Sequence, residues 1–336
     1  MRATTPPGML IREYGDEDET AVLSLLASSL GGGPTGTRSP RLFRWKHLDN
    51  PSGRSLMLLA ACDERVVGLR AFMRWRFVGD AEVIRAVRAV DTATHPDFQG
   101  RGIFRTLTLE ALDRLRGDTD VVFNTPNEKS MPGYLKMGWR SVGRLPVLLA
   151  PRHPVRMLGR WRAADQRPTG LVDAPTAAEA LADPDVPRLL VGRPERRLHT
   201  IRTPEYLRWR YADAPLLDYR AVTERDSGGR LSAMAIFRVR LRGSLREATV
   251  SELLLGQGGA AVGRRLLRAV ARAGRVDHLA MVFAPRSPER SAARRAGALR
   301  APGGVTLLCN PLHDPIDPDP TSMTSWALTT GDVEVF

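Results

Sequence analysis

With 336 residues the chain is long enough for two domains, and its 43% hydrophobic and 26% charged residues exclude a disordered protein. Its net charge of +13 comes almost entirely from arginine, since lysine occurs only at positions 46, 129 and 136. These arginines are spread along the chain among Asp and Glu, which argues against a nucleic-acid-binding face. No run approaches the ~20 apolar residues of a membrane span, and Met1–Gly8 lacks the pattern of a signal peptide. The sequence therefore predicts a cytoplasmic protein that binds neither nucleic acid nor membrane.

An internal repeat organises the chain. The segment Arg38–Pro51 aligns without gaps with Arg202–Pro215, and Arg, Pro, Arg, Trp, Asp and Pro recur in register. Each copy predicts a short helix, because Ser39 or Thr203 stands at the N-cap position and proline follows at the first helical position.

Similar elements follow both copies of the repeat. Strand-like runs are expected near 56–62, 66–77 and 83–94 in the first half, and near 219–224, 231–241 and 246–255 in the second. Each set leads into an amphipathic helical pattern, at 103–115 and 262–271, then into a short apolar strand, at 121–123 and 280–283, and a helix that ends near Gly138 or Gly297. This order indicates a duplication. A stretch rich in Pro, Arg and Ala at 146–200 places the boundary, so we expect domains at 1–150 and 151–336.

The two cysteines, Cys62 and Cys309, lie in separate apolar, strand-like runs. Reduced, buried cysteine is the usual state in such positions. We therefore expect no disulfide and no metal site.

The segment Val90–Phe104 carries the first chemical signal. An extended run breaks at His95–Pro96 and passes through a turn containing Gly100 and Gly102 into a helix. Glycines at a helix start let backbone N–H groups approach a phosphate closely, and the helix dipole favours negative charge there. The alternative is an ordinary glycine turn between a strand and a helix. For these two glycines alone, that alternative is preferred.

The residues Gln99-Gly-Arg-Gly-Ile-Phe104 resemble the acyl-CoA-binding motif of the GNAT superfamily of N-acyltransferases. That motif is Gln or Arg, two residues of any type, Gly, one residue of any type, then Gly or Ala. Phe104 departs from it, since a small residue is expected there. The resemblance implies acetyl-CoA as cosubstrate, with its pyrophosphate on backbone groups of the loop and its pantetheine arm along the preceding strand. The implied binding residues are Thr92, Ala93, Thr94, Gln99, Gly100, Arg101, Gly102, Ile103 and Phe104.

A second segment, Asn127–Trp139, resembles a later motif of the same superfamily. The motif has Asn, a small residue three positions on, Tyr at seven, Gly at eleven and an aromatic at twelve. The matching residues are Asn127, Ser130, Tyr134, Gly138 and Trp139. The resemblance implies that Tyr134 is the general acid near the CoA sulfur and that Asn127 anchors the corner or contacts CoA. A strand N–H near Ala93 or Thr94 would polarise the thioester carbonyl. The alternative for Tyr134 is a half-buried helix aromatic with a solvated hydroxyl.

The general base stays open between three residues. Asp91 is a candidate catalytic residue, but it is also suited to hydrogen bonding at a strand end. His95 is equally a turn residue before proline. Glu128 is equally a carboxylate in the first turn of a helix. The sequence does not choose among them.

The second half keeps the repeated elements and loses the motifs. Gly258-Gly-Ala-Ala aligns with Gln99-Gly-Arg-Gly, Ala293 aligns with Tyr134, and Asn127 has no counterpart. We therefore expect an α+β protein with two tandem GNAT-like domains, each a central mixed, mostly antiparallel sheet flanked by helices. The first domain is expected to be catalytic and the second degenerate.

The expected activity is transfer of an acetyl group from acetyl-CoA to a primary amine of an unidentified acceptor. A small molecule is the favoured acceptor, and the sequence sets no oligomeric state. The alternative is a non-catalytic acyl-CoA-binding or regulatory protein. Tyr134 argues against it, because binding alone needs no proton donor near the thiol.

Overall fold

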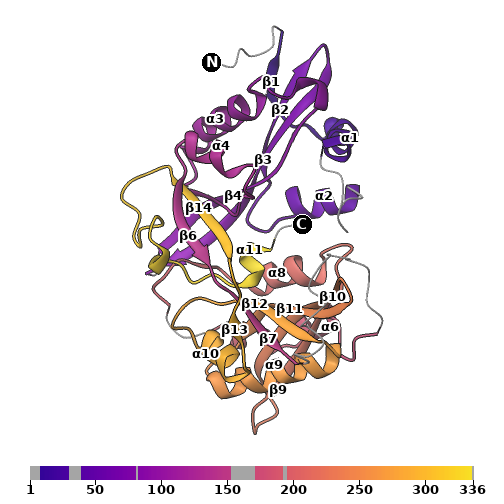
Figure 1. Cartoon of the computed structure of the whole chain (residues 1–336), viewed down its shortest axis with the longest axis vertical. Helices are drawn as coiled ribbons and strands as arrows, with labels where there is room; N and C mark the ends of the chain where they lie inside the picture. The colour runs from indigo at the N-terminus through magenta and orange to yellow at the C-terminus, as the bar shows by residue number, and fades with distance from the viewer. Residues whose placement is uncertain (1–7, 30–38, 81, 153–170, 192–194, 335–336) are drawn as a thin grey trace. The chain divides into compact units, whose positions relative to one another are not determined.

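The computed structural model describes residues 8–29, 39–80, 82–152, 171–191 and 195–334. The chain divides into two compact units, one made of Met1–Gly143 with Thr306–Ser325 and the other of Arg144–Val305 with Trp326–Phe336. Each unit contains a mixed sheet flanked by helices (Figure 1), which confirms the predicted fold class. In the described ranges, no helix combines the length and apolar character needed to cross a membrane.

Unit 1 is built on a sheet with the strand order β1-β2-β3-β4-β5-β14-β6. Its strands β1 to β4 pair antiparallel, β4 pairs parallel with β5, and β14 pairs antiparallel with β5. The strands are β1 (Leu10–Glu13), β2 (Leu56–Cys62), β3 (Arg65–Gly79), β4 (Glu82–Thr94), β5 (Val121–Asn124), β6 (Arg140–Leu145) and β14 (Val305–Pro311).

Helices cover both faces of this sheet, with α1 and α2 on one side and α3 and α4 on the other (Figure 1). Ser39 caps α2 as predicted, because its hydroxyl accepts a hydrogen bond from the Leu42 N–H at 3.2 Å. The helices are α1 (Glu19–Ser29), α2 (Pro40–His47), α3 (Ile103–Leu115) and α4 (Met131–Lys136), with short 3₁₀ turns at Asp16–Asp18, Pro96–Phe98 and Met323–Ser325.

The strands β4 and β5 pair over a short distance only. Their parallel ladder joins Ala86 to Val121, Val87 to Val122 and Arg88 to Phe123, whereas β4 continues to Thr94. A β-bulge lies in the continuing part, where Arg70 of β3 is opposite Thr92 and Ala71 is opposite Val90. Asp91 is the extra residue of this bulge. The carboxyl end of β4 therefore runs on beyond its pairing with β5.

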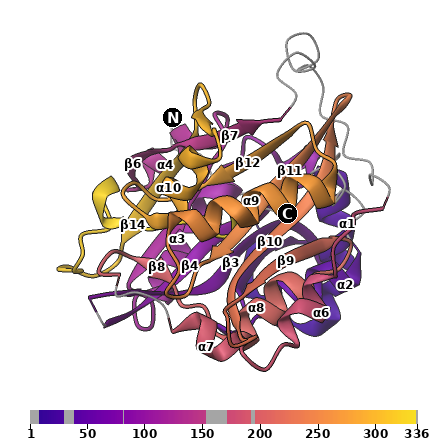
Figure 2. The ribbon, with the colours of Figure 1, turned by 90° about the horizontal axis from the view of Figure 1, so that it is seen from below.

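Unit 2 repeats this plan, with the strand order β13-β7-β12-β11-β10-β9. Figure 2 shows α9 lying across β10 and β11. The strands are β7 (Val147–Pro151), β9 (Tyr219–Arg225), β10 (Leu231–Arg242), β11 (Leu245–Leu254), β12 (His278–Val282) and β13 (Leu299–Arg300), with β8 at His199–Thr200. The helices are α6 (Ala177–Leu181), α7 (Val186–Leu190), α8 (Pro204–Leu207), α9 (Ala260–Gly274), α10 (Pro288–Arg295) and α11 (Thr330–Val333), with a π-helical turn at Arg208–Ala212.

The repeat helix of unit 2 also begins as predicted, since the Thr203 hydroxyl accepts from the Tyr206 N–H at 3.0 Å. Every strand expected from the pattern is present, with bounds within two residues of those predicted. Cys62 and Cys309 are buried and not joined in a disulfide, as expected.

Candidate functional site

The loop between β4 and α3 has the backbone conformation that its glycines predict. Gly100 and Gly102 have φ angles of +75° and +77°, in the left-handed region that glycine adopts without a steric penalty. Gly102 is the N-cap residue of α3, and no side chain caps the helix. The first N–H groups of α3 are thus placed for an anionic ligand. No atom lies within 4 Å of the position a Cβ on Gly100 would take, so this side of the loop is open.

Two side chains of the loop stabilise its conformation. The Gln99 amide donates to the carbonyl oxygen of Thr94 at 3.4 Å. The Arg101 guanidinium donates to the carbonyl oxygen of Asp97 at 3.0 Å and lies 5.0 Å from the centre of the Phe98 ring. Because both side chains contact the protein itself, the backbone is the part of the loop best placed to bind a ligand.

Phe104, which departs from the family motif, packs away from the loop. Its ring meets the Tyr134 ring edge-on with centroids 5.6 Å apart. A Cβ on Gly133 would lie 3.2 Å from the Phe104 ring, so glycine at this position of α4 makes room for it. The bulky side chain is therefore accommodated against α4.

The second motif forms the β5 to α4 corner. The Asn127 side-chain oxygen accepts hydrogen bonds from the N–H of Ser130 at 2.9 Å and from its hydroxyl at 3.1 Å. Asn127 thus holds the residue that precedes α4. Tyr134 is buried on α4, with its ring 5.1 Å from that of Trp139. Gly138, with φ of +100°, ends the helix.

Asp91 contacts two side chains of α2, Lys46 and His47. Its carboxylate lies 2.8 Å from Lys46 Nζ and 2.9 Å from His47 Nε2, and all three side chains are buried. The other ring nitrogen of His47 lies 2.9 Å from the Ser55 hydroxyl. A chain of hydrogen bonds therefore runs from Asp91 through His47 to Ser55.

The other two candidate bases lie in different surroundings. His95 caps the 3₁₀ turn at Pro96–Phe98, accepting from the Asp97 N–H at 3.3 Å, and its Nε2 lies 2.6 Å from an Arg65 nitrogen. Glu128 is exposed next to Asn127. The structure thus separates the three candidates: Asp91 is buried on the α2 side of the sheet, whereas His95 and Glu128 lie on loops.

Two polar residues that the sequence analysis did not select lie buried near the motifs. Arg70 of β3 is fully buried, and its guanidinium carbon lies 5.3 Å from the centre of the Tyr134 ring. Asn124 ends β5, and its side-chain oxygen is buried without a hydrogen-bond partner among the described residues. An arginine within the apolar run of β3 was the available sequence signal for Arg70.

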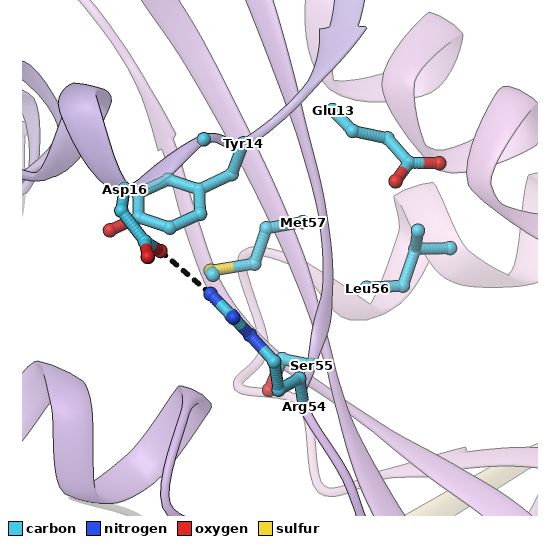
Figure 3. Close-up of a pocket in the computed structure, with 8 residues that line it drawn as sticks. Glu13, Tyr14, Asp16, Arg54, Ser55, Leu56 and Met57 are labelled. Carbon is cyan, nitrogen blue, oxygen red and sulfur yellow. Dashed lines mark hydrogen bonds and ion pairs between the residues drawn. The ribbon is translucent and has the colours of Figure 1, made fainter.

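A cavity of about 430 Å³ opens in unit 1 where β1 ends and β2 begins (Figure 3). An ion pair between Asp16 and Arg54, 2.6 Å apart, lies along its wall. Burial, followed by the charges of Glu19 and Asp16, raises the pKa of Tyr14 to about 12, so this lining phenol is neutral at physiological pH. The cavity is lined by Glu13, Tyr14, Gly15, Asp16, Arg54, Ser55, Leu56 and Met57.

None of the predicted site residues lines this cavity. Ser55 nevertheless connects it to the buried pair of His47 and Asp91. Among the described residues, no group of three or more His, Cys, Asp or Glu side chains is arranged to hold a metal ion.

Unit 1 thus combines a mixed sheet with a short parallel ladder, a glycine loop at a helix start and a tyrosine on the next helix. Residues 10–142 match the family model of the acetyltransferase (GNAT) domain. These residues therefore form a GNAT acetyltransferase domain, and the match supports an acyltransferase. GNAT proteins use an acyl-CoA and an acceptor substrate in general.

Solved structures with the same fold match most of the chain at low sequence identity. A probable N-acyltransferase from Enterococcus faecalis has a TM-score of 0.63 at 14% identity, and the match covers 90% of this chain and 73% of that one. A GCN5-related N-acetyltransferase from Anabaena variabilis has a TM-score of 0.60 at 10% identity, covering 94% and 81%. One from Kribbella flavida has a TM-score of 0.56 at 16% identity, covering 90% and 70%. No curated protein matches the sequence.

Proposed function

We propose that unit 1 transfers an acetyl group from acetyl-CoA to a primary amine of a small-molecule acceptor. The observation that carries this proposal is the open glycine loop at the start of α3, which closely follows the part of β4 that pairs with β3 but no longer with β5. Backbone N–H groups of Gln99–Phe104 bind the pyrophosphate, and Thr92–Thr94 line the pantetheine arm. Unit 2 is the degenerate copy.

The reaction is a direct attack of the neutral amine on the thioester carbonyl. An N–H of Ala93 or Thr94 polarises that carbonyl and stabilises the oxyanion. As the tetrahedral intermediate collapses, the C–S bond breaks and Tyr134 gives its proton to the departing thiolate. Asn127 supports this step by fixing the start of α4, the helix that carries Tyr134.

The amine must lose a proton, and Asp91 is our first choice for the base. The contacts through His47 to Ser55 provide a hydrogen-bonded route from Asp91 to the cavity at the end of β1. His95 and Glu128 stay as alternatives.

The cofactor site is tested with Gly102→Glu, which adds bulk and negative charge where the phosphates are placed. We expect the variant to fold and to lose acetyl-CoA binding in calorimetry. Gly229→Glu is the matched control, because Gly229 has a similar left-handed φ of +76°, is exposed in unit 2, and has nothing within 4 Å of its Cβ position. If folded Gly102→Glu binds acetyl-CoA as tightly as the parent, the loop does not hold the cofactor.

The rival function is a non-catalytic acyl-CoA-binding or regulatory protein. A thiol-release assay with acetyl-CoA against a panel of amines separates the two. Release that depends on the amine supports the transferase. Tight acetyl-CoA binding with no amine-dependent release across the panel would favour the rival.

A further inference from the structure

Arg70 places a guanidinium group in the interior of unit 1. Its Nη1 donates to the carbonyl oxygen of Val90 at 3.3 Å and to the Thr92 hydroxyl. Its Nε and Nη2 atoms are buried, and neither has a hydrogen-bond partner among the described residues. A fully buried side chain thus keeps two donor nitrogens of a charged group without an acceptor among the described residues.

Such an arrangement is costly for folding. A buried charge without a paired anion destabilises the folded state, and buried donors are nearly always satisfied. The ring of Phe72, 4.4 Å from the guanidinium carbon, offsets part of this cost through its π face. The face of a ring attracts the positive charge, but it does not accept the hydrogen bonds that the guanidinium donates in its own plane.

The two donors form one edge of the guanidinium. The Nε and Nη2 hydrogens point in the same direction with a spacing that matches the two oxygens of a carboxylate. The chain uses this same edge elsewhere. Arg44 donates from Nε and Nη2 to Glu19 at 2.7 and 2.8 Å, and Arg265 does so to Glu224 at 2.6 and 2.8 Å.

The position of this edge points to a ligand of the reaction site. The guanidinium carbon lies 5.5 Å from the ring centre of Phe104, in the first turn of α3, and 5.3 Å from that of Tyr134, the proposed general acid. Phe104 is itself partly exposed, so a residue that neighbours the guanidinium reaches the surface. The pairing of β10 with β11 in unit 2 has a similar register shift, between Ile236 and Phe237. Ile236, opposite Glu252, therefore takes the position that Arg70 has in unit 1. The arginine is therefore specific to the unit that retains the motifs.

We propose that the Nε and Nη2 edge of Arg70 binds a carboxylate carried by one of the two substrates. The source is either the free carboxylate of a dicarboxylic acyl group on CoA or the α-carboxylate of an amino-acid acceptor. This inference rests on the proposed function and names the substrate class of the same site. The thioester carbonyl is a poorer match, because a single neutral oxygen engages one donor well and leaves the charge unpaired.

The test compares paired substrates on the full-length protein. One arm uses succinyl-CoA against acetyl-CoA with the same amine, and the other uses an amino acid against its amide with acetyl-CoA. We expect the carboxylated member of one pair to have a kcat/KM higher by ~10- to 100-fold, the range of a charge-assisted hydrogen-bonded pair. The arm that shows the preference identifies the source.

Three variants assign that preference to Arg70. Arg70→Met should abolish it, and Arg70→Lys should remove most of it, because lysine keeps the charge without the two-donor edge. Arg76→Met is the matched control, since Arg76 is exposed on the same strand, and it should retain the preference. Calorimetry of the acyl-CoA pair, or of the acceptor pair, gives a readout that does not depend on turnover.

Two results would overturn the inference. One is a parent enzyme that shows no preference in either arm. The other is an Arg70→Lys or Arg70→Met variant that lowers kcat/KM equally for all four substrates, which indicates a contact with the common thioester or a structural role. If Arg70→Met does not fold, the parent and Arg70→Lys decide. Amine-dependent acetyl transfer without a carboxylate preference leaves the proposed function intact, whereas absence of acyl-CoA binding overturns both.

Discussion

Tyr134 lies between the rings of Phe104 and Trp139 on the short helix α4. The two aromatic contacts hold the ring, and the hydroxyl is the group to which we assign the proposed proton transfer. Removing the hydroxyl should therefore disturb packing little. The residue offers a direct test of the proposed proton transfer.

Tyr134→Phe is expected to retain acetyl-CoA affinity and to lower turnover by ~10²- to 10⁴-fold, the usual loss when a general acid is removed. Calorimetry gives the affinity, and single-turnover kinetics give the chemical step. Turnover equal to that of the parent, under conditions where chemistry limits the rate, would assign the proton donor to water or to another group.

Glu247 on β11 is a buried carboxylate of unit 2. It lies 2.9 Å from His278 Nε2 and 2.6 Å from an Arg240 nitrogen. Burial alone would raise the pKa of this carboxyl, but the hydrogen bond from His278 and the charges of Arg240 and Arg242 outweigh burial and lower the pKa to about 2. The ionised form is thus favoured by folding.

This shift predicts acid sensitivity. Because the pKa in the folded protein lies below the ordinary value of 4.5, the stabilisation is fully present above that value and is lost as pH falls towards 2. Glu247→Gln should lower the thermal midpoint at pH 7 and lie closer to the parent at pH 3. Glu224→Gln, at the exposed pair with Arg265, should change the midpoint little at either pH. A difference between Glu247→Gln and parent that is the same at both pH values would refute the assignment.

At the scale of elements, the position of the Gln99–Phe104 loop depends on how closely α3 approaches the sheet. Gly68 on β3 faces α3, and a Cβ there would lie 2.6 Å from Ile103 and 3.2 Å from Leu107. The backbone of Gly68 is not in the left-handed region, so its conformation does not require glycine. Glycine is required because the first turn of α3 approaches the strand too closely for a side chain. The helix start that carries the N–H groups is therefore set by a contact with a strand.

Gly68→Ala should push α3 away from β3 and destabilise the protein by ~1 to 3 kcal/mol, as overpacking does. Acetyl-CoA affinity should fall as well, because the displaced part of α3 includes the loop. Gly117→Ala is the control, since its Cβ position is open. Chemical denaturation and calorimetry measure the two effects. An alanine variant with parental stability and affinity would mean that α3 shifts without consequence for the loop.

At the scale of the whole molecule, the end of the chain contributes to each unit. Thr306–Ser325 belongs to unit 1, where β14 lies between β5 and β6. In unit 2, β11 and β12 also pair over three residues only, from Glu247 and His278 to Thr249 and Ala280. Beyond that ladder the Val282 N–H donates to the Thr330 hydroxyl at 2.7 Å, and Thr329 forms a bridge with Phe283.

In unit 2, the segment around α11 therefore pairs with the end of β12, just beyond the point where β12 stops pairing with β11. The Ser251 hydroxyl donates to Glu334 at 3.2 Å on the β11 side. A Cβ on Gly331 would clash with Tyr211 and would lie 2.8 Å from Glu252, so the segment is packed tightly there. An acyl-CoA arm would have to displace these contacts.

The full chain is therefore expected to bind one equivalent of acetyl-CoA, and Gly102→Glu should remove it completely. Calorimetric stoichiometry measures this directly. A second equivalent that persists in Gly102→Glu would show that unit 2 forms a working site, and our assignment of roles to the two units would then be wrong.

The sequence by itself predicted the elements and the motif positions. Ser39 and Thr203 cap the repeat helices, because a cap is a hydrogen bond within a few residues. The strands follow from the alternation of apolar residues, and the left-handed turns follow from Gly100 and Gly102. Each of these features depends on neighbouring residues alone.

The tertiary structure decided which distant side chains meet. The register of β3 against β4 brings Arg70 beside Thr92, and the packing of α2 on the sheet brings His47 to Asp91. The sequence predicted a contiguous boundary near 150 and gave no sign that 306–325 joins the first unit, because pairing between β14 and β5 leaves no local pattern. Local signals placed the two motifs along the chain, and strand register and packing decided which charged side chains lie around them.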